Sequence, residues 1–131
     1  MARGENPGMV LSIETTLDYD KDERYGHASA GKDLVLSILG SGANIGKGQL
    51  GADGANIAGK FLDLDEKGVA SVMVTGTPMI MRKSSASLPP GSKVVCAGSG
   101  KIKAAAADTD GRGIVWKVLE TGDNGRVLVI L

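Results

Sequence analysis

The chain has 131 residues, a typical length for one domain, and 42% of them are apolar, which excludes intrinsic disorder. Its fifteen basic and fifteen acidic residues balance, so bulk electrostatics do not favour a polyphosphate or an anionic membrane as a partner. No apolar run reaches the roughly 18 residues of a membrane span, and residues 1–8 lack the apolar stretch of a signal peptide. We therefore expect no membrane association and a protein that stays soluble in a cytosol-like compartment.

Glycine is abundant in this chain and aromatic residues are scarce. There are twenty glycines, and the aromatic residues are Tyr19, Tyr25, Phe61 and Trp116. A core with so few rings is filled by smaller aliphatic side chains, each of which buries less area than a ring. We expect such a thin core to gain part of its stability from an oligomer or a larger partner.

The first third of the chain alternates between irregular and strand-like segments. Gly4, Pro7 and Gly8 predict an extended arm over residues 1–8, and the apolar run at residues 9–14 predicts a first strand. This arm precedes a single β domain that we place at residues 9–131.

A polar run at residues 18–24 predicts a solvated loop, and the apolar run at residues 33–39 predicts a buried strand. Residues 40–59 contain seven glycines. Each interior glycine disfavours a helix by about 1 kcal/mol relative to alanine. We therefore expect a long glycine-rich loop or a set of tight turns in this segment.

From residue 60 onward, short apolar runs follow one another, separated by Gly, Pro and Asp turns. The predicted strands cover residues 61–64, 69–75, 79–82, 93–97, 101–107, 114–119 and 126–131. Asn124 and Gly125 supply the left-handed conformations of a hairpin turn before the last strand. That strand is apolar on both faces, which predicts that it is central or covered on both sides and acts as internal scaffold. The spacing predicts an all-β fold, a small β-barrel or a β-sandwich.

Several short motifs resemble binding sites but lack the required context. Residues 46–51 match G-x-G-x-x-G, but more glycines follow where a dinucleotide site needs a helix. Asp18, Asp20 and Asp22 have the spacing of a calcium loop, but the sixth position is Glu23 and the twelfth is Ser29, where Gly and Glu are needed. A solvated acidic loop is the favoured interpretation.

Catalytic and metal-ligating residues are equally sparse. His27 and Cys96 are each the only residue of their type, so neither a zinc site nor a nucleophilic triad is indicated, and Cys96 at an alternating strand position predicts a small buried side chain. Lys101 and Lys103 share a strand face without aromatic residues between them, which argues against nucleic-acid binding. We predict no enzymatic activity, no catalytic residues, no cofactor and no metal. By elimination, the functional surface is an extended protein interface.

A family resemblance adds positive evidence over residues 56–131. The pieces that carry it are a strand ending at glycine, a Pro-Pro-Gly turn leading into a valine-rich strand, a Gly-Ser-Gly turn, and a closing hairpin on which the chain ends. They lie at residues 69–76, 88–95, 97–102 and 113–131. In this order they resemble the capsid decoration (cement) proteins of tailed bacteriophages. Residues 1–40 match nothing firmly, and residues 40–59 are longer and richer in glycine than the family pattern.

The resemblance implies a virion structural protein that binds the outer surface of a phage capsid and stabilises the expanded head. The implied partner is the major capsid protein, the implied state is a homo-oligomer with a trimer favoured, and the implied location is the capsid exterior after synthesis in the bacterial host cytoplasm. We expect the arm and first strand to pair with or lie along a capsid strand, as β-augmentation allows, while the closing hairpin does not touch the capsid. The candidate contact residues are Arg3, Glu5, Asn6, Pro7, Met9, Val10 and Leu11.

Two alternatives remain open. The first is another phage structural β module, such as a tail or receptor-binding component. The second is a small β-barrel enzyme with sites between the subunits of a trimer, as in trimeric nucleotide hydrolases, although the acidic and tyrosine-containing motif expected beside a hairpin is missing.

Overall fold

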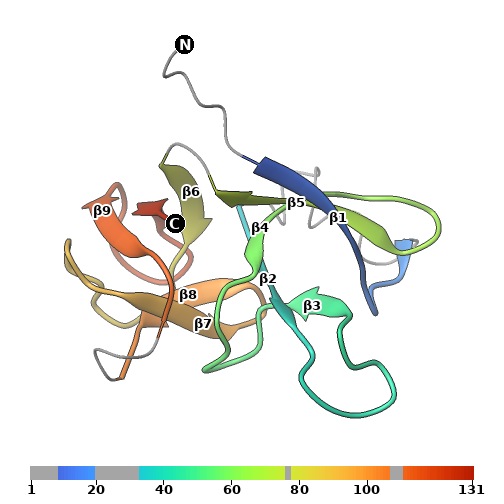
Figure 1. Cartoon of the computed structure of the whole chain (residues 1–131). Helices are drawn as coiled ribbons and strands as arrows, with labels where there is room; N and C mark the ends of the chain where they lie inside the picture. Colours follow the sequence, from blue (N-terminus) through green and yellow to red (C-terminus); the bar gives the residue numbers. More distant parts are fainter. Residues whose placement is uncertain (1–8, 20–32, 76–77, 107–110) are drawn as a thin grey trace.

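The computed structural model describes residues 9–19, 33–75, 78–106 and 111–131, and these residues form an all-β fold with several antiparallel sheets (Figure 1). This confirms the predicted fold class. The strands are β1 (Met9–Glu14), β2 (Val35–Ile38), β3 (Gly48–Leu50), β4 (Gly59–Leu64), β5 (Val69–Thr75), β6 (Met79–Arg82), β7 (Val94–Gly98), β8 (Lys101–Ala104), β9 (Ile114–Val118) and β10 (Arg126–Ile130). Sequence patterns predicted each of these strands except β3, with ends that differ by one or two residues at most sites.

The first lobe comprises residues 9–19 and 33–75 and contains one five-stranded sheet in the order β1-β5-β4-β2-β3. The sheet coils until its two edges meet at a single bridge between Thr15 and Gly48, where the Thr16 N–H donates to the Gly48 carbonyl at 3.0 Å. A Cβ on Gly48 would already lie 3.4 Å from the methyl carbons of Ile13 and Thr15. The edges do not pair further, so the predicted barrel alternative is wrong for this sheet.

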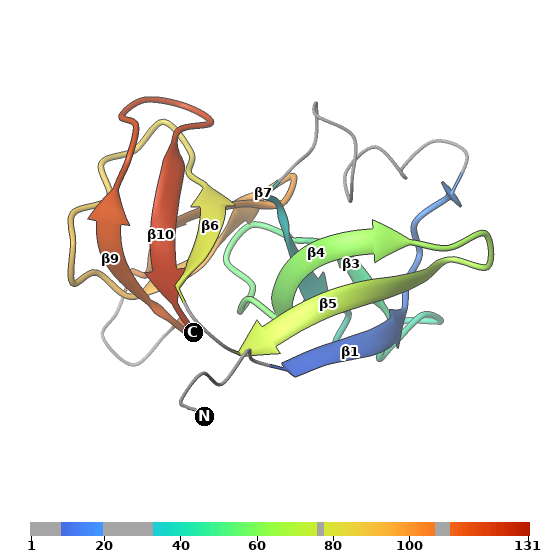
Figure 2. The same cartoon turned by 90° about the horizontal axis from the view of Figure 1, so that it is seen from above.

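The second lobe comprises residues 78–106 and 111–131 and holds two smaller sheets, β6-β10-β9 and β7-β8. The two sheets face each other, and Figures 1 and 2 show β7 and β8 running beneath β6, β9 and β10. Single bridges, Lys83 to Ile102 and Lys93 to Ile114, tie the sheets at their sides without closing a continuous ladder. The arrangement is compatible with the β-sandwich that the sequence predicted as its other alternative.

Each lobe has its own core, and β2 forms part of both. The first core contains Leu36, Phe61, Leu64, Ala70 and Val72. The second core fills the space between the two small sheets and also takes in Val35 and Ile57 from the first lobe. Because successive residues of a strand point to opposite faces, Val35 enters one core and Leu36 the other, and both are fully buried. This explains why two successive residues in the middle of the run at residues 33–39 are both apolar.

The glycine-rich residues 40–59 form tight turns and strand pieces, not one long loop. Gly42 and Gly46 have φ of 86° and 89°, β3 lies between the turns, and Gly59 already begins β4. Other glycines permit close packing: a Cβ on Gly51 would lie 2.6 Å from the Cys96 sulfur. The segment therefore needs glycine for two separate physical reasons.

The closing hairpin differs from its prediction in the turn. Asn124 has φ of 66° as expected, but the other left-handed residue is Gly122, with φ of 87°, rather than Gly125. Gly125 is required for space, because a Cβ there would lie 2.3 Å from the Glu120 carbonyl oxygen. β10 lies between β6 and β9, which confirms its central position.

Candidate binding surface

β1 presents an unpaired strand edge. β5 pairs antiparallel along one side of Met9–Glu14, and within the described residues no strand pairs with the other side until the chain reaches Thr15. Met9, Val10 and Leu11 are 53%, 52% and 45% exposed, so three consecutive apolar side chains lie on both faces of this edge. Natural edge strands are commonly protected by lysine, proline or a covering loop. The sequence of β1 has neither lysine nor proline, which makes it a template for another strand.

The structure places only part of the predicted contact set. Met9, Val10 and Leu11 lie in β1, whereas Arg3, Glu5, Asn6 and Pro7 lie outside the described residues. In Figures 1 and 2 the beginning of β1 lies on the side of the first lobe that faces the second lobe.

A second apolar surface lies on the outer face of the β6-β10-β9 sheet. Its members alternate with buried residues along each strand and point away from the second core; they are Ile80, Ile114, Trp116, Leu128 and Ile130. Trp116 is 56% exposed, and Ile114 and Ile130 are also largely exposed. The inner residues Val127 and Val129 are fully buried, and Leu131 packs against the same core.

This outer face decides between the two alternatives predicted for the last strand, because β10 is central in its sheet and, among the described residues, is covered on one face only. β10 is covered on its inner face, while nothing in the described part of the chain lies over Ile130. Trp116 and Lys117 are adjacent in the sequence of β9. In the structure Lys117 pairs with Leu128 of β10, so a charged residue lies beside the outer apolar face. A lysine on the neighbouring strand indicates that this face of the sheet is exposed to solvent. Large exposed apolar patches mark interaction sites.

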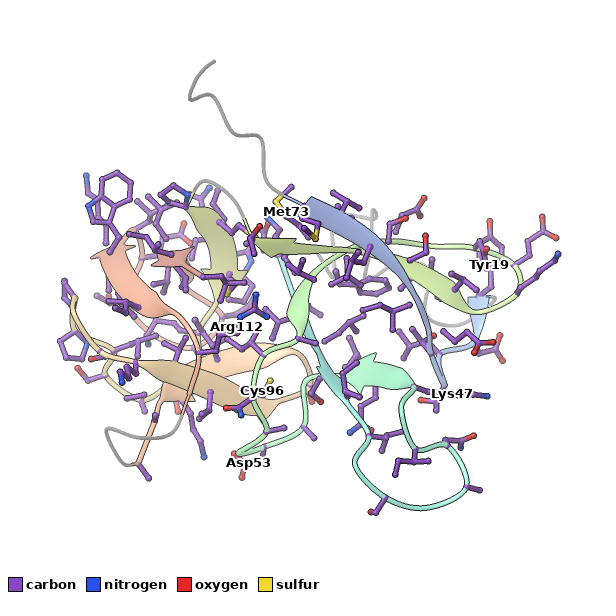
Figure 3. The ribbon with its side chains drawn as sticks, in the orientation of Figure 1. Tyr19, Lys47, Asp53, Met73, Cys96 and Arg112 are labelled. Atoms are coloured by element: carbon purple, nitrogen blue, oxygen red, sulfur yellow. The ribbon has the colours of Figure 1, made fainter. Side chains whose placement is uncertain are left out.

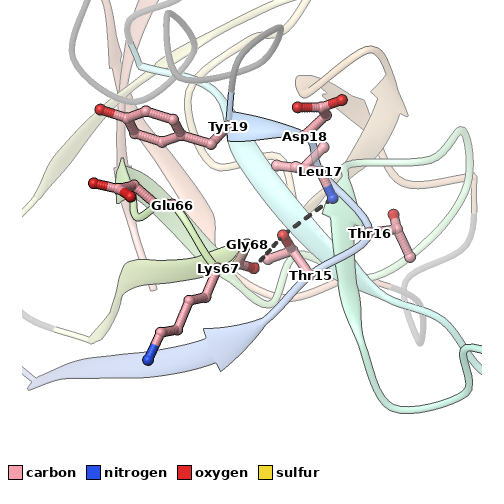
Figure 4. Close-up of a pocket in the computed structure, with 8 residues that line it drawn as sticks. All are labelled: Thr15, Thr16, Leu17, Asp18, Tyr19, Glu66, Lys67 and Gly68. Atoms are coloured by element: carbon pink, nitrogen blue, oxygen red, sulfur yellow. Dashed lines mark hydrogen bonds between the residues drawn. The ribbon is translucent and has the colours of Figure 1, made fainter.

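A groove of about 760 Å³ lies where β1 ends beside the β4–β5 turn (Figure 4). Its lining residues are Thr15, Thr16, Leu17, Asp18, Tyr19, Glu66, Lys67 and Gly68. The Thr15 hydroxyl is committed to the turn, because it donates to the Gly68 carbonyl at 2.7 Å and accepts from the Leu17 N–H at 3.1 Å. Over the part of the chain that the structure describes, no cluster of three His, Cys, Asp or Glu residues is arranged to hold a metal ion.

The motifs set aside at the sequence level occupy structural positions where the structure describes them. The match at residues 46–51 runs from a turn through β3 into another turn, with no helix to receive a phosphate. Asp65 closes the β4–β5 turn, since its carboxylate accepts from the N–H groups of Lys67 and Val69 at 2.8 and 2.9 Å. Asp20, Asp22 and His27 lie outside the described residues.

Burial and pairing determine the electrostatics of the second lobe. Cys96 is fully buried, and burial raises the pKa of its thiol to about 12, which removes it as a nucleophile at neutral pH. Glu120 is exposed, and hydrogen bonds from Arg126 lower the pKa of its carboxyl group. Neither group has the surroundings of a catalytic residue.

Comparison with known proteins adds no relative. No protein-family model matches the sequence, and no curated protein matches it significantly. No helix of the described residues is long and apolar enough to cross a membrane.

Proposed function

We propose that this chain is a non-enzymatic virion structural protein that binds the outer surface of a phage capsid, through the major capsid protein, and stabilises the expanded head. The resemblance of residues 56–131 to capsid decoration proteins supports the partner. The unpaired edge of β1, with Met9, Val10 and Leu11 exposed, supports binding through that edge and is the observation that carries the proposal.

The proposed contact is addition of a capsid strand to β1. Main-chain hydrogen bonds along the free edge supply affinity, and the exposed side chains on both faces supply the apolar contacts. Residues 1–8 lead directly into this edge, so an arm running along the capsid surface would continue the same interface.

The outer face of β6-β10-β9 provides a second apolar contact surface in this proposal. In a trimer, the state that the resemblance favours, part of each copy's apolar surface becomes buried between copies, and this face offers Trp116, Ile114 and Ile130 for that purpose. The unpaired edge of β1 would then remain available to bind the capsid on the virion exterior.

The test measures binding to expanded, undecorated heads of the phage that encodes the chain, by co-sedimentation at increasing protein concentration. We expect wild type to saturate expanded heads and to leave unexpanded heads unbound. Val10→Lys should bind at least about tenfold more weakly, because a charge would be buried against the added strand. Deleting residues 1–8 should also reduce occupancy.

Ile45→Lys is the matched control for Val10→Lys. Ile45 is 63% exposed in the loop between β2 and β3, so the substitution makes the same change of charge away from the β1 edge, and binding should stay at the wild-type level. Equal binding by wild type and Val10→Lys would overturn the edge as the contact. Binding of wild type to host cells, with none to heads, would favour a tail or receptor-binding component instead.

A further inference from the structure

Lys83 is a buried cation that has no counter-charge among the described residues. The residue follows β6 directly and is 3% exposed. Its Nζ donates to the Ser84 carbonyl at 2.7 Å and to the Gly122 carbonyl at 3.1 Å. Across the described residues no carboxylate lies within ion-pair distance of this nitrogen, and the third N–H of the ammonium has no acceptor.

The acidic residues on either side of Gly122 in the sequence form ion pairs with other cations. Glu120 and Asp123 flank the Gly122 carbonyl that Lys83 contacts, on the connection between β9 and β10. Glu120 accepts from Arg126 at 3.1 Å, and Asp123 pairs with Lys101 at 3.0 Å. A buried ammonium destabilises the fold unless it is paired with a negative charge and fully hydrogen-bonded. Among the described residues Lys83 has no carboxylate partner.

Lys83 also lines a cavity of about 380 Å³ at one end of the second lobe. Three residues that carry hydroxyl groups, Ser85, Ser87 and Thr121, share the lining with the apolar residues Leu88 and Val118. This volume is within the range of small-molecule sites, and the combination of a few polar groups with apolar walls is typical of them. A single positive charge and three hydroxyls match one monoanionic group better than a phosphate, which requires more donors.

We propose that this cavity binds a carboxylate on a short aliphatic stem, whose oxygen accepts the free N–H of Lys83 while the stem lies against Leu88 and Val118. A free short-chain carboxylic acid and a glutamate side chain of another protein present this same chemistry. The proposal does not depend on the capsid as partner, because any carboxylate of this size satisfies it.

The test is a titration of the full chain followed through the backbone amide resonances of Ser84, Ser85, Thr121 and Gly122. The probes are butyrate with butyramide as its neutral match, and N-acetyl-glutamate N-methylamide with the corresponding glutamine compound. We expect saturable shifts at these amides with both carboxylates and none with the neutral compounds. Tighter binding of the blocked glutamate would identify a protein side chain as the ligand, and tighter binding of butyrate a free acid.

Lys83→Met keeps the apolar stem of the side chain and removes its charge, so the carboxylates should bind about tenfold more weakly or worse. If that variant does not fold, Thr121→Val provides a second measurement, because it removes a lining hydroxyl and leaves Lys83 in place; binding should again weaken. Equal shifts with butyrate and butyramide, no saturation up to about 50 mM, or wild-type affinity in these variants would overturn the proposal.

Discussion

Cys96 is a closely packed residue of the second core. Its backbone N–H donates to the Ala55 carbonyl and its carbonyl accepts from the Gly54 N–H, both at 2.8 Å, while Gly51 leaves room for its sulfur. The thiol is fully buried, and burial raises its pKa from an ordinary value of 9.0 to about 12. The residue is therefore a packing residue whose ionisation opposes folding.

This raised pKa predicts a loss of stability at alkaline pH. As the pH rises above 9.0, the unfolded chain releases the thiol proton while the folded chain retains it up to about 12, so the free energy of unfolding falls across that interval. The contribution approaches about 1.4 kcal/mol per pH unit. Urea denaturation of wild type and Cys96→Ala at about pH 8 and pH 10.5 measures it. Wild type should lose more stability than the alanine variant, and equal losses would show that the thiol ionises without unfolding.

The glycine-rich residues 40–59 illustrate what the pattern of an element predicts and what it leaves open. Glycine content alone excluded a helix, and tight turns were among the two expectations. β3 was missed because Gly48–Leu50 contains one apolar residue and pairs with β2 through its backbone. Its position depends on the close approach of Gly48 to Ile13 and Thr15, which involves residues more than thirty positions away.

Within this segment Gly59 is a tightly packed glycine, and Gly40 is an open glycine that serves as its control. At Gly59 a Cβ would lie 2.4 Å from a methyl carbon of Val72 and 2.7 Å from the Met73 carbonyl oxygen, whereas at Gly40 nothing lies within 4 Å. Neither position has a positive φ. We expect Gly59→Ala to lower the free energy of unfolding by about 1–3 kcal/mol through overpacking. Gly40→Ala should be neutral or raise it by up to about 1 kcal/mol, because the unfolded chain loses freedom. Urea denaturation measures both, and equal effects would contradict the packing explanation.

Strand-scale patterns predicted most of the sheet but not its exposed faces. Alternation placed Val127, Val129 and Leu131 on one face of the last strand, and the structure buries that face. The apolar character of Leu128 and Ile130 indicated either a central strand or a second covered face; β10 is central, and no layer covers this face among the described residues. Periodicity reports which side chains share a face, while the presence of a covering layer depends on tertiary or quaternary contacts. The β1 edge was predicted as a contact strand for the same local reason, its apolar run beside the arm.

The two lobes form one structure through polar contacts as well as through the shared strand β2. Asp33 pairs with Lys60 of the first lobe at 2.9 Å and with Arg82 of the second at 3.4 Å. Arg112 lies between the lobes in Figure 3. Its guanidinium donates to the carbonyls of Ile57 and Ala58 at 3.2 and 2.8 Å, and also to the carbonyl of Val74. Sequence alone did not identify this residue, because its partners are backbone carbonyls that no pattern marks.

Replacing Arg112 tests whether this connection holds the lobes together. Arg112→Ala would leave three carbonyls without their donor, and each unsatisfied buried polar group costs about 1–3 kcal/mol. Arg112→Lys should recover only part of the loss, because a single ammonium does not reproduce the planar guanidinium that reaches β5 and the start of β4 together. Urea denaturation measures the change in the free energy of unfolding. Arg126→Ala is the control; it removes the same charge from an exposed ion pair with Glu120, so we expect a much smaller loss than for Arg112→Ala.

Native-state hydrogen exchange separates a loss of coupling from a uniform loss of stability. Val72 reports the first core and Val129 the second. In wild type the two amides should exchange through one common opening of both lobes, since the lobes share β2 and the Arg112 contacts. In Arg112→Ala we expect the protection of one amide to fall below that of the other, as one lobe opens without its neighbour. Equal reduction at both amides would mean that β2 alone couples the lobes, and that Arg112 contributes stability without contributing cooperativity.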